Sequence, residues 1–251
     1  MKNKIIPILL FSISLASCDW FSFSKYKFDN QEIILNDCSN EQDENSDCAE
    51  VSINYLNCKK PSEFAQKFND TIQKRIIYLL IGEVSEKMTI QEASEQFMNS
   101  YKSDNELYGQ VPPYQIQVAD SIFFQNDKII TLASYAYEYS GGVHGIGNTT
   151  FFNFKPSGEC YTNDELFIDK EKITQIAEKY FREQIQIKEG QSYSDNGFWF
   201  DDDEFELSQN IGFKGDDMIL YYNPYEIAPY SLGSFEIHIP IKEVKEWINI
   251  L

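Results

Sequence analysis

Histidine is scarce in this sequence, which contains only His144 and His238. The two are far apart, so the closely spaced histidine pairs that hold zinc on a helix are excluded. No CxxC pair is present, and no acidic segment has the spacing of an EF-hand calcium loop. We therefore predict no metal site and no cofactor.

Basic residues are also few. The chain has 21 lysines and arginines against 40 acidic residues, and its formal net charge is -19. A surface this acidic repels nucleic acid and anionic lipid headgroups and attracts cationic partners, so nucleic-acid binding is excluded. Solubility in a crowded compartment would explain the charge equally well. Hydrophobic residues make up 42% of the chain, which is enough for a folded core.

No apolar run is long enough to cross a membrane as a helix, and the longest run lies at the N-terminus. Two lysines precede Ile5–Ala16, a segment of twelve residues that is too short to cross a bilayer as a helix. The sequence LASC then ends at Cys18, which is typical of a bacterial lipoprotein cleavage site. We expect residues 1–17 to be a signal peptide and Cys18 to carry the lipid that anchors the mature protein in the cell envelope.

An ordinary secretory signal with an incidental cysteine is the alternative. Asp19 follows the cysteine, and an aspartate there retains some enterobacterial lipoproteins in the inner membrane. That rule does not hold for every phylum, so the choice between inner and outer membrane stays open. Cleavage would remove Lys2 and Lys4 and lower the net charge to -21.

Four cysteines remain after Cys18, an even number that favours disulfides in an exported protein. Residues between Cys48 and Cys58 alternate apolar and polar, which predicts a strand that holds its ends about 30 Å apart. A disulfide needs Cα atoms within about 7 Å, so these two cysteines do not pair. We favour Cys38–Cys48 with Cys58–Cys160, and the pairing of Cys38 with Cys58 stays open.

The apolar pattern predicts an α+β fold, an antiparallel sheet with helices packed mainly on one face, in two interlocked halves. We expect residues 18–47 to be a lipidated tether and acidic loop, 48–140 the N-terminal half and 141–251 the C-terminal half. Helices are predicted at about 62–80, 89–101 and 169–186 and near the C-terminus. Strands are predicted at 49–57, 114–124, 129–139, 149–154, 218–222 and 234–239.

His144 lies among four glycines in the segment SGGVHGIG. Gly141 and Gly142 can adopt positive φ and turn a strand sharply, while Gly145 and Gly147 let neighbouring groups approach the backbone closely. This structural interpretation competes with a catalytic one, in which His144 acts with Ser140 or an acidic residue. No GxSxG nucleophile motif is present.

The string NPYEIAPYSLG, Asn223 to Gly233, carries a family resemblance. With the GGVHG turn before an aromatic strand, it resembles a bacterial extracytoplasmic domain of unknown function. That domain is shared with the lysozyme-sensing anti-sigma factors and with the N-terminal region of some peptidoglycan deacetylases. The resemblance covers roughly residues 50–251 and implies an α+β fold and recognition at the cell wall. Neither a sigma-binding segment nor a deacetylase domain accompanies it here.

Three hypotheses follow. The first is a lipid-anchored binding module for a cationic protein such as lysozyme or for a peptidoglycan fragment. The second is an envelope hydrolase or transferase that uses His144, and the third is a purely structural lipoprotein. We favour the first and expect no enzymatic activity, while the oligomeric state stays open. The candidate ligand-binding residues are His144, Tyr222, Tyr225, Glu226 and Tyr230.

Overall fold

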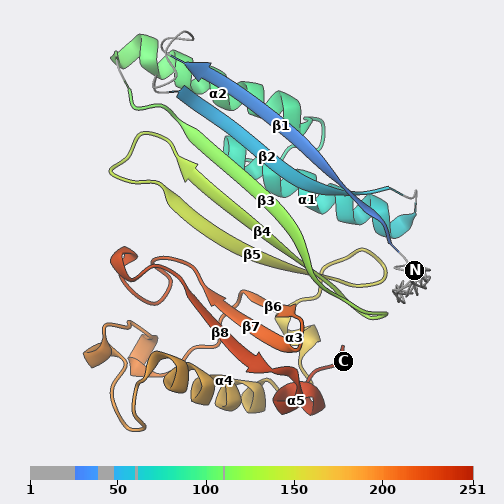
Figure 1. Ribbon diagram of the computed structural model, residues 1–251, viewed down its shortest axis with the longest axis vertical. Helices are drawn as coiled ribbons and strands as arrows, with labels where there is room; N and C mark the ends of the chain where they lie inside the picture. The colour runs from blue at the N-terminus through green and yellow to red at the C-terminus, as the bar shows by residue number, and fades with distance from the viewer. Residues whose placement is uncertain (1–25, 39–47, 60–61, 110, 251) are drawn as a thin grey trace, which may run out of the picture.

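The computed structural model describes residues 26–38, 48–59, 62–109 and 111–250. Two β-sheets and their helices form an α+β fold, as predicted (Figure 1). The predicted signal peptide and Cys18 lie outside the described residues. No helix in the described ranges is both long and apolar enough to cross a membrane.

The larger sheet has five strands in the order β1-β2-β3-β4-β5. The strands are β1 Phe28–Cys38, β2 Cys48–Cys58, β3 Gln115–Gln125, β4 Ile130–Tyr139 and β5 Ile146–Phe154. The expectation of a wholly antiparallel sheet is wrong for one pair, because β2 and β3 run parallel. A parallel pair needs a long crossover, and two helices provide it.

Those helices are α1 Glu63–Ile81 and α2 Ile90–Tyr108, and both begin where the sequence predicts. The Ser62 hydroxyl accepts from the Ala65 N–H, and Thr89 forms a capping box with Glu92. Both helices cover one face of the larger sheet (Figure 1). Their buried side chains, such as Phe68 and Ile72, share a core with the inward residues of β2 and β3.

The smaller sheet is antiparallel and comprises β6 Ile211–Lys214, β7 Asp217–Tyr222 and β8 Phe235–Pro240. Helix α4 Lys170–Ile185 packs on it (Figure 1). The sequence did not predict β6, which has four residues and too little alternation to be recognised. Short helices complete the chain: α3 Asn163–Leu166, α5 Ile241–Val244, and 3-10 turns at Ser194–Asn196, Asp201–Asp203, Tyr230–Leu232 and Lys245–Trp247.

Two asparagine side chains join the sheets at the open edge of β5. The Asn210 amide accepts from the Phe151 N–H at 2.8 Å and donates to the Thr149 carbonyl at 2.7 Å. Asn223 accepts from the Thr149 N–H at 2.7 Å. At Thr149 and at the Phe151 N–H these amides take the place of a sixth strand, so these backbone groups of the edge are paired.

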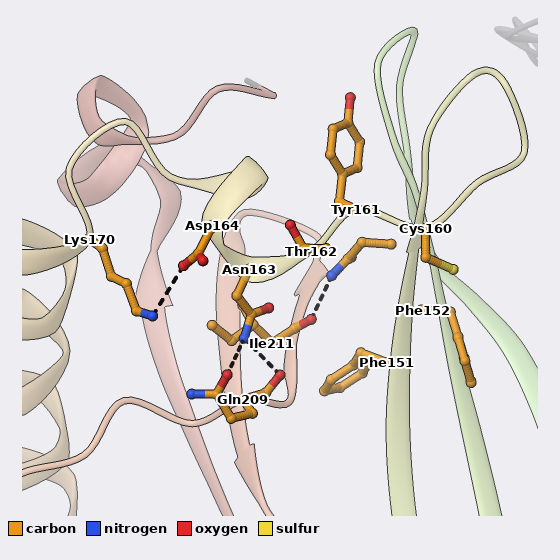
Figure 2. Close-up of a pocket in the computed structure, with 11 residues that line it drawn as sticks. Phe151, Phe152, Cys160, Tyr161, Thr162, Asn163, Asp164, Lys170, Gln209 and Ile211 are labelled. Atoms are coloured by element: carbon orange, nitrogen blue, oxygen red, sulfur yellow. Dashed lines mark hydrogen bonds and ion pairs between the residues drawn. The ribbon is translucent and has the colours of Figure 1, made fainter.

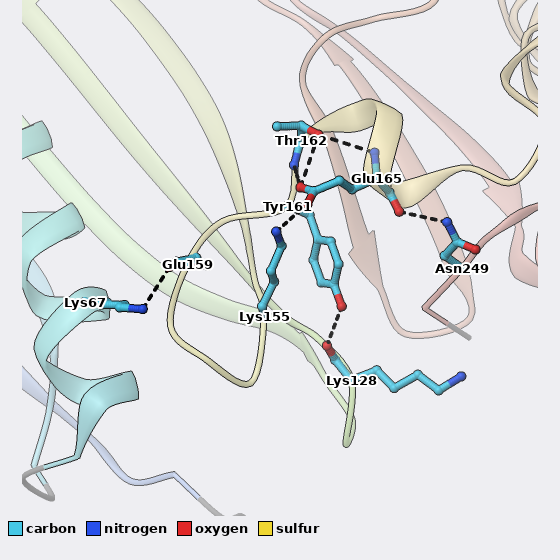
Figure 3. A network of polar contacts seen from close by, with 8 residues as sticks. All are labelled: Lys67, Lys128, Lys155, Glu159, Tyr161, Thr162, Glu165 and Asn249. Atoms are coloured by element: carbon cyan, nitrogen blue, oxygen red, sulfur yellow. Dashed lines mark hydrogen bonds and ion pairs between the residues drawn. The ribbon is translucent and has the colours of Figure 1, made fainter.

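Ion pairs also join the turn that follows β5 to the helices α1 and α3 (Figure 3). Lys67 on α1 binds Glu159 at 2.8 Å, and Lys155 binds Glu165 at 2.6 Å. The Asn249 side chain donates to the Glu165 carbonyl at 3.0 Å. The turn that carries Glu159 is therefore tied both to the helical layer and to α3.

The structure corrects two predicted boundaries. Residues 28–38 belong to no tether, because they form β1 and pair with β2 along their whole length. The division at residue 141 is also misplaced, since β5 continues the larger sheet to Phe154. Polar side chains on the exposed face of β1 gave the segment the composition of a loop.

The predicted disulfide between Cys38 and Cys48 is confirmed, and it joins the facing ends of β1 and β2. The predicted Cys58–Cys160 disulfide is wrong, because both residues retain thiols in the structure. Cys58 is buried, and its backbone N–H donates to Asn69 at 2.8 Å. Burial raises the pKa of Cys160 to about 11, so this thiol stays protonated at neutral pH.

Candidate functional site

The two sequence motifs meet at one end of the larger sheet. The GGVHG turn connects β4 to β5, and the NPYEIAPYSLG segment connects β7 to β8. Together they assemble a group of aromatic side chains that we call the aromatic corner. Its members are Tyr137, Tyr139, His144, Tyr225 and Tyr230.

His144 is exposed and lies flat against Tyr230, with the ring centroids 3.9 Å apart and the ring planes inclined by 17°. Its Nδ1 lies 3.0 Å from the Gly145 carbonyl oxygen, and its Nε2 lies 3.4 Å from the Tyr225 hydroxyl. Since a carbonyl can only accept, Nδ1 carries the proton and Nε2 accepts from Tyr225. The Tyr230 hydroxyl donates to the same Gly145 carbonyl at 2.8 Å.

The glycines of the turn fulfil two separate roles. Gly141 has a φ of 88° and turns the chain, whereas Gly142 does not adopt positive φ. A Cβ at Gly145 would overlap the ring of Tyr137, and one at Gly147 would lie 2.9 Å from the Tyr135 hydroxyl oxygen. These two glycines therefore let the tyrosine rings of β4 lie down over β5, as the sequence predicted for close approach.

Tyr225 occupies a position that normally belongs to glycine. The turn Asn223–Glu226 is closed by a bond from the Glu226 N–H to the Asn223 carbonyl at 3.1 Å. Pro224 is its second residue and Tyr225, with a φ of 71°, its third. A bulky side chain is unfavourable in this left-handed conformation. Such strain is concentrated at functional sites, and it presents the Tyr225 ring to solvent, 51% exposed.

The corner borders a hollow of about 430 Å³. The hollow is lined by Cys48, Pro113, Gln115, Tyr137, Tyr139, Val143, His144, Gly145 and Tyr230. No carboxylate or ammonium group is among these lining residues, although the chain as a whole is strongly acidic. The site therefore offers aromatic rings, hydroxyls and one amide, and it suits an uncharged ligand with both apolar and hydroxylated faces.

Two of the predicted ligand-binding residues are not in the corner. Tyr222 is buried in the core between α4 and the smaller sheet, and its hydroxyl donates to the Glu206 carbonyl at 2.7 Å. Burial raises the pKa of Tyr222, so its hydroxyl remains protonated. The Glu226 carboxylate accepts from the Asn223 N–H at 2.9 Å. Both residues therefore stabilise the NPYEIAPYSLG segment and do not belong to the aromatic corner.

The arrangement that the catalytic hypothesis requires is not formed. Within the described residues, the hydrogen-bonding neighbours of His144 are Gly145 and Tyr225, and neither is a carboxylate. The Ser140 hydroxyl lies 3.5 Å from a Glu138 oxygen rather than at the imidazole. His238 is exposed, as predicted, and lies 3.1 Å from both Asp217 and Glu236 on the distant smaller sheet.

In the described ranges, no group of three or more His, Cys, Asp or Glu side chains lies close enough together to bind a metal ion. A second hollow, of about 390 Å³, lies where the two sheets join (Figure 2). Its polar side chains bind one another: Asn163 donates to the Gln209 carbonyl at 3.0 Å, and Lys170 pairs with Asp164 at 3.2 Å. These groups are satisfied internally, so the aromatic corner is the stronger candidate.

Sequence reasoning missed the contribution of β4. Tyr135, Tyr137 and Tyr139 alternate with smaller or acidic residues, so one face of this strand carries three tyrosines in line. The signal was present in the sequence, because an alternation of period two predicts a shared face. What the sequence did not disclose is that this face remains uncovered where it reaches His144.

Two family models match successive parts of the chain. Residues 42–147 match the model described as deacetylase PdaC, and residues 164–242 match the protein of unknown function DUF3298. The chain is therefore similar to a PdaC domain over its N-terminal part and to a DUF3298 domain over its C-terminal part. This confirms the resemblance that the NPYEIAPYSLG motif suggested. Tyr137 and His144 lie in the PdaC region and Tyr225 and Tyr230 in the DUF3298 region, so the corner forms where the two regions meet.

Solved structures share this fold. A DUF3298 family protein from Bacteroides fragilis is 20% identical, with a TM-score of 0.66 over 90% of this chain and 94% of that one. A DUF3298 family protein from Pseudomonas aeruginosa is 15% identical, with a TM-score of 0.68 over 90% and 95% of the two chains. At these identities the likeness concerns the fold alone. No curated protein matches the chain.

Proposed function

We propose that this protein is a lipid-anchored binding protein of the cell envelope, and that its aromatic corner recognises a peptidoglycan fragment. The observation that carries the proposal is the exposed stack of His144 on Tyr230 beside an uncharged hollow. Sugar rings present C–H groups that pack on aromatic faces and hydroxyls that bond to tyrosine and amide groups. The strained backbone of Tyr225, which holds a third ring at the same place, supports a binding role.

The position of the corner also fits a lipid anchor at Cys18. Eight residue steps separate Cys18 from Tyr26, so they reach at most about 28 Å. Tyr26 stacks on Phe64 with centroids 3.8 Å apart, at the end of the sheet where β1 begins. The corner adjoins the other end of β1, about 36 Å away along eleven residues. An anchor at Cys18 would therefore leave the site at the end of the sheet farther from the membrane, which supports a role at the wall.

A cationic protein such as lysozyme is the second candidate ligand, and the acidic surface favours it. The mature chain carries a formal net charge of -21, which accelerates encounters with cationic partners. Charge attraction alone disappears as salt screens it. The uncharged lining of the hollow makes the glycan the better fit to the corner itself.

Co-sedimentation with purified peptidoglycan sacculi tests the proposal, with a Cys18→Ser chain that cannot receive lipid. We expect this chain to sediment with sacculi, and the additional substitution Tyr230→Ala to weaken binding at least tenfold. Tyr78→Ala is the control, because Tyr78 is an exposed tyrosine on α1 that does not belong to the corner. Equal sedimentation of both tyrosine variants would place binding elsewhere on the protein.

Lysozyme titration separates the two ligands. Heat that persists from about 0.15 M to about 0.5 M salt would establish specific lysozyme binding and favour the second candidate. Binding heat that disappears at the higher salt concentration would mean that lysozyme is held by charge attraction alone. For the anchor, cells given labelled palmitate should incorporate the label into this protein, and Cys18→Ser should abolish the incorporation. Label that persists in the Cys18→Ser chain would overturn lipid attachment at Cys18.

A further inference from the structure

One face of the larger sheet is open beside the aromatic corner. Val51, Ile53 and Ile116 point into the helical core, so the residues that alternate with them on β2 and β3 lie on the opposite face. The strand register aligns side chains of that face in three rows across β1, β2, β3 and β4. The rows are Asn36–Glu50–Gln115–Tyr139, Ile34–Ser52–Gln117–Tyr137 and Glu32–Asn54–Ala119–Tyr135.

These rows are accessible, since none of their twelve residues is buried. The smaller sheet begins to cover this face at the next row, Ser121–Ala133–Phe151, where Ala133 and Phe151 pack against Ile219. It continues beyond that row over Phe123 and Phe124. Figure 1 shows that α1 and α2 lie behind this part of the sheet. We call the accessible surface that these three rows form the floor.

The floor continues into the corner. Gln115 and Tyr139 belong to the first row and also line the hollow beside His144. Tyr137 does the same for the second row. Tyr230 and His144 form one side of the hollow, and from there the rows extend outward across β3, β2 and β1.

The floor is a polar surface with few charges. Its twelve positions hold four amides, three tyrosines and one serine, with two glutamates and no basic residue. Amide side chains both donate and accept hydrogen bonds, which matches hydroxyl and acetamido groups. A cationic protein would need more carboxylates, and an anionic polymer would be repelled by Glu32 and Glu50.

The dimensions agree with a sugar chain that crosses the strands. Neighbouring strands lie about 4.8 Å apart, which is close to the length of one sugar unit in an extended, β-linked glycan. Four strands then span about 15 Å, enough for three or four sugars. Each sugar would face the side chains of one strand.

We propose that an extended, uncharged glycan chain binds along these rows, with one end in the aromatic corner and successive sugars over β3, β2 and β1. This inference rests on the proposed function, because it names the path and length of the ligand at the same site. Ile34, 53% exposed on the outermost strand, provides the apolar contact at the far end.

Calorimetry with N-acetylglucosamine oligomers tests the path. The Cys18→Ser chain should bind the tetrasaccharide at least tenfold more tightly than the disaccharide. Ser52→Trp blocks the middle row on β2, where the third sugar would lie, and should remove this gain. The disaccharide reaches only from the corner to β3, so its affinity should be kept. Ser100→Trp, on the exposed side of α2, is the control for an added tryptophan and should change neither affinity.

The outcomes separate the two proposals. Equal affinity for both oligomers, or a gain that survives Ser52→Trp, would overturn the path across the strands and leave binding at the corner intact. Absence of binding to either oligomer would overturn both, provided that sacculi are not bound either. Sacculus binding without oligomer binding would overturn only the extended path of a bare glycan.

Discussion

The imidazole of His144 lies on the ring of Tyr230, 3.9 Å between centroids, although 86 positions separate the two residues along the chain. Both side chains also reach the backbone carbonyl of Gly145. The contact closes the aromatic corner between the regions that the two family models match. A change on either side should therefore affect binding through the other.

Tyr225→Gly should separate binding from stability. Glycine tolerates the φ of 71° that tyrosine adopts here with strain, so the free energy of unfolding should stay unchanged or rise by about 0.5–1 kcal/mol. Binding to sacculi should weaken, because the exposed ring is lost. Urea denaturation and co-sedimentation measure the two effects. A loss of stability together with unchanged binding would show that the ring has a structural purpose only.

Gly145→Ala should destabilise the fold, since its methyl group would overlap the Tyr137 ring. Overpacking of this kind costs about 1–3 kcal/mol in the free energy of unfolding. Gly142→Ala is the matched control on the same turn, because its Cβ would have only the His144 carbonyl oxygen nearby, at 3.8 Å. Equal urea midpoints for the two variants would contradict the close packing of tyrosine on glycine.

Much of the fold was predictable from local patterns. Ser62 and Thr89 mark the starts of α1 and α2 because their side chains cap the helices, an interaction encoded within four residues. Cys38 and Cys48 were paired correctly because the strand after Cys48 excludes the competing bond to Cys58. Such features depend on neighbours in sequence, so the sequence discloses them.

The rest depends on distant contacts. The Asn223 side chain binds Thr149 of β5, which lies 74 positions away along the chain. Tyr222 and Tyr225 are three residues apart, yet one is buried and the other exposed, which only the path of the turn decides. The parallel pairing of β2 with β3 likewise follows from the helical crossover rather than from either strand alone.

Asn210→Ala should loosen the junction between the sheets. It removes two hydrogen bonds to β5 and leaves the Phe151 N–H without that partner, at a cost of about 1–3 kcal/mol in the free energy of unfolding. Asn30→Ala, at an exposed position of β1, is the control and should change stability by less than about 0.5 kcal/mol. Similar losses of stability in both variants would mean that the Asn210 amide contributes no more than an exposed asparagine does.

Cys160 should react slowly with a thiol reagent in the folded protein. Burial raises its pKa to about 11, so at pH 8 the reactive thiolate is scarce, and the rate should rise as the pH approaches 11. In denaturant the Cys18→Ser chain should reveal two thiols, those of Cys58 and Cys160. Fewer than two would indicate a disulfide that the structure does not contain.

The most direct test follows the two histidines by NMR in a tag-free Cys18→Ser chain. Soluble muropeptides, released from sacculi, are added while the imidazole C–H signals are recorded. The signals of His144 should shift in a saturable way, while those of His238, on the smaller sheet, stay in place as an internal control. Signals of His144 that remain unmoved at saturating ligand, or that move no more than those of His238, would contradict recognition at the aromatic corner.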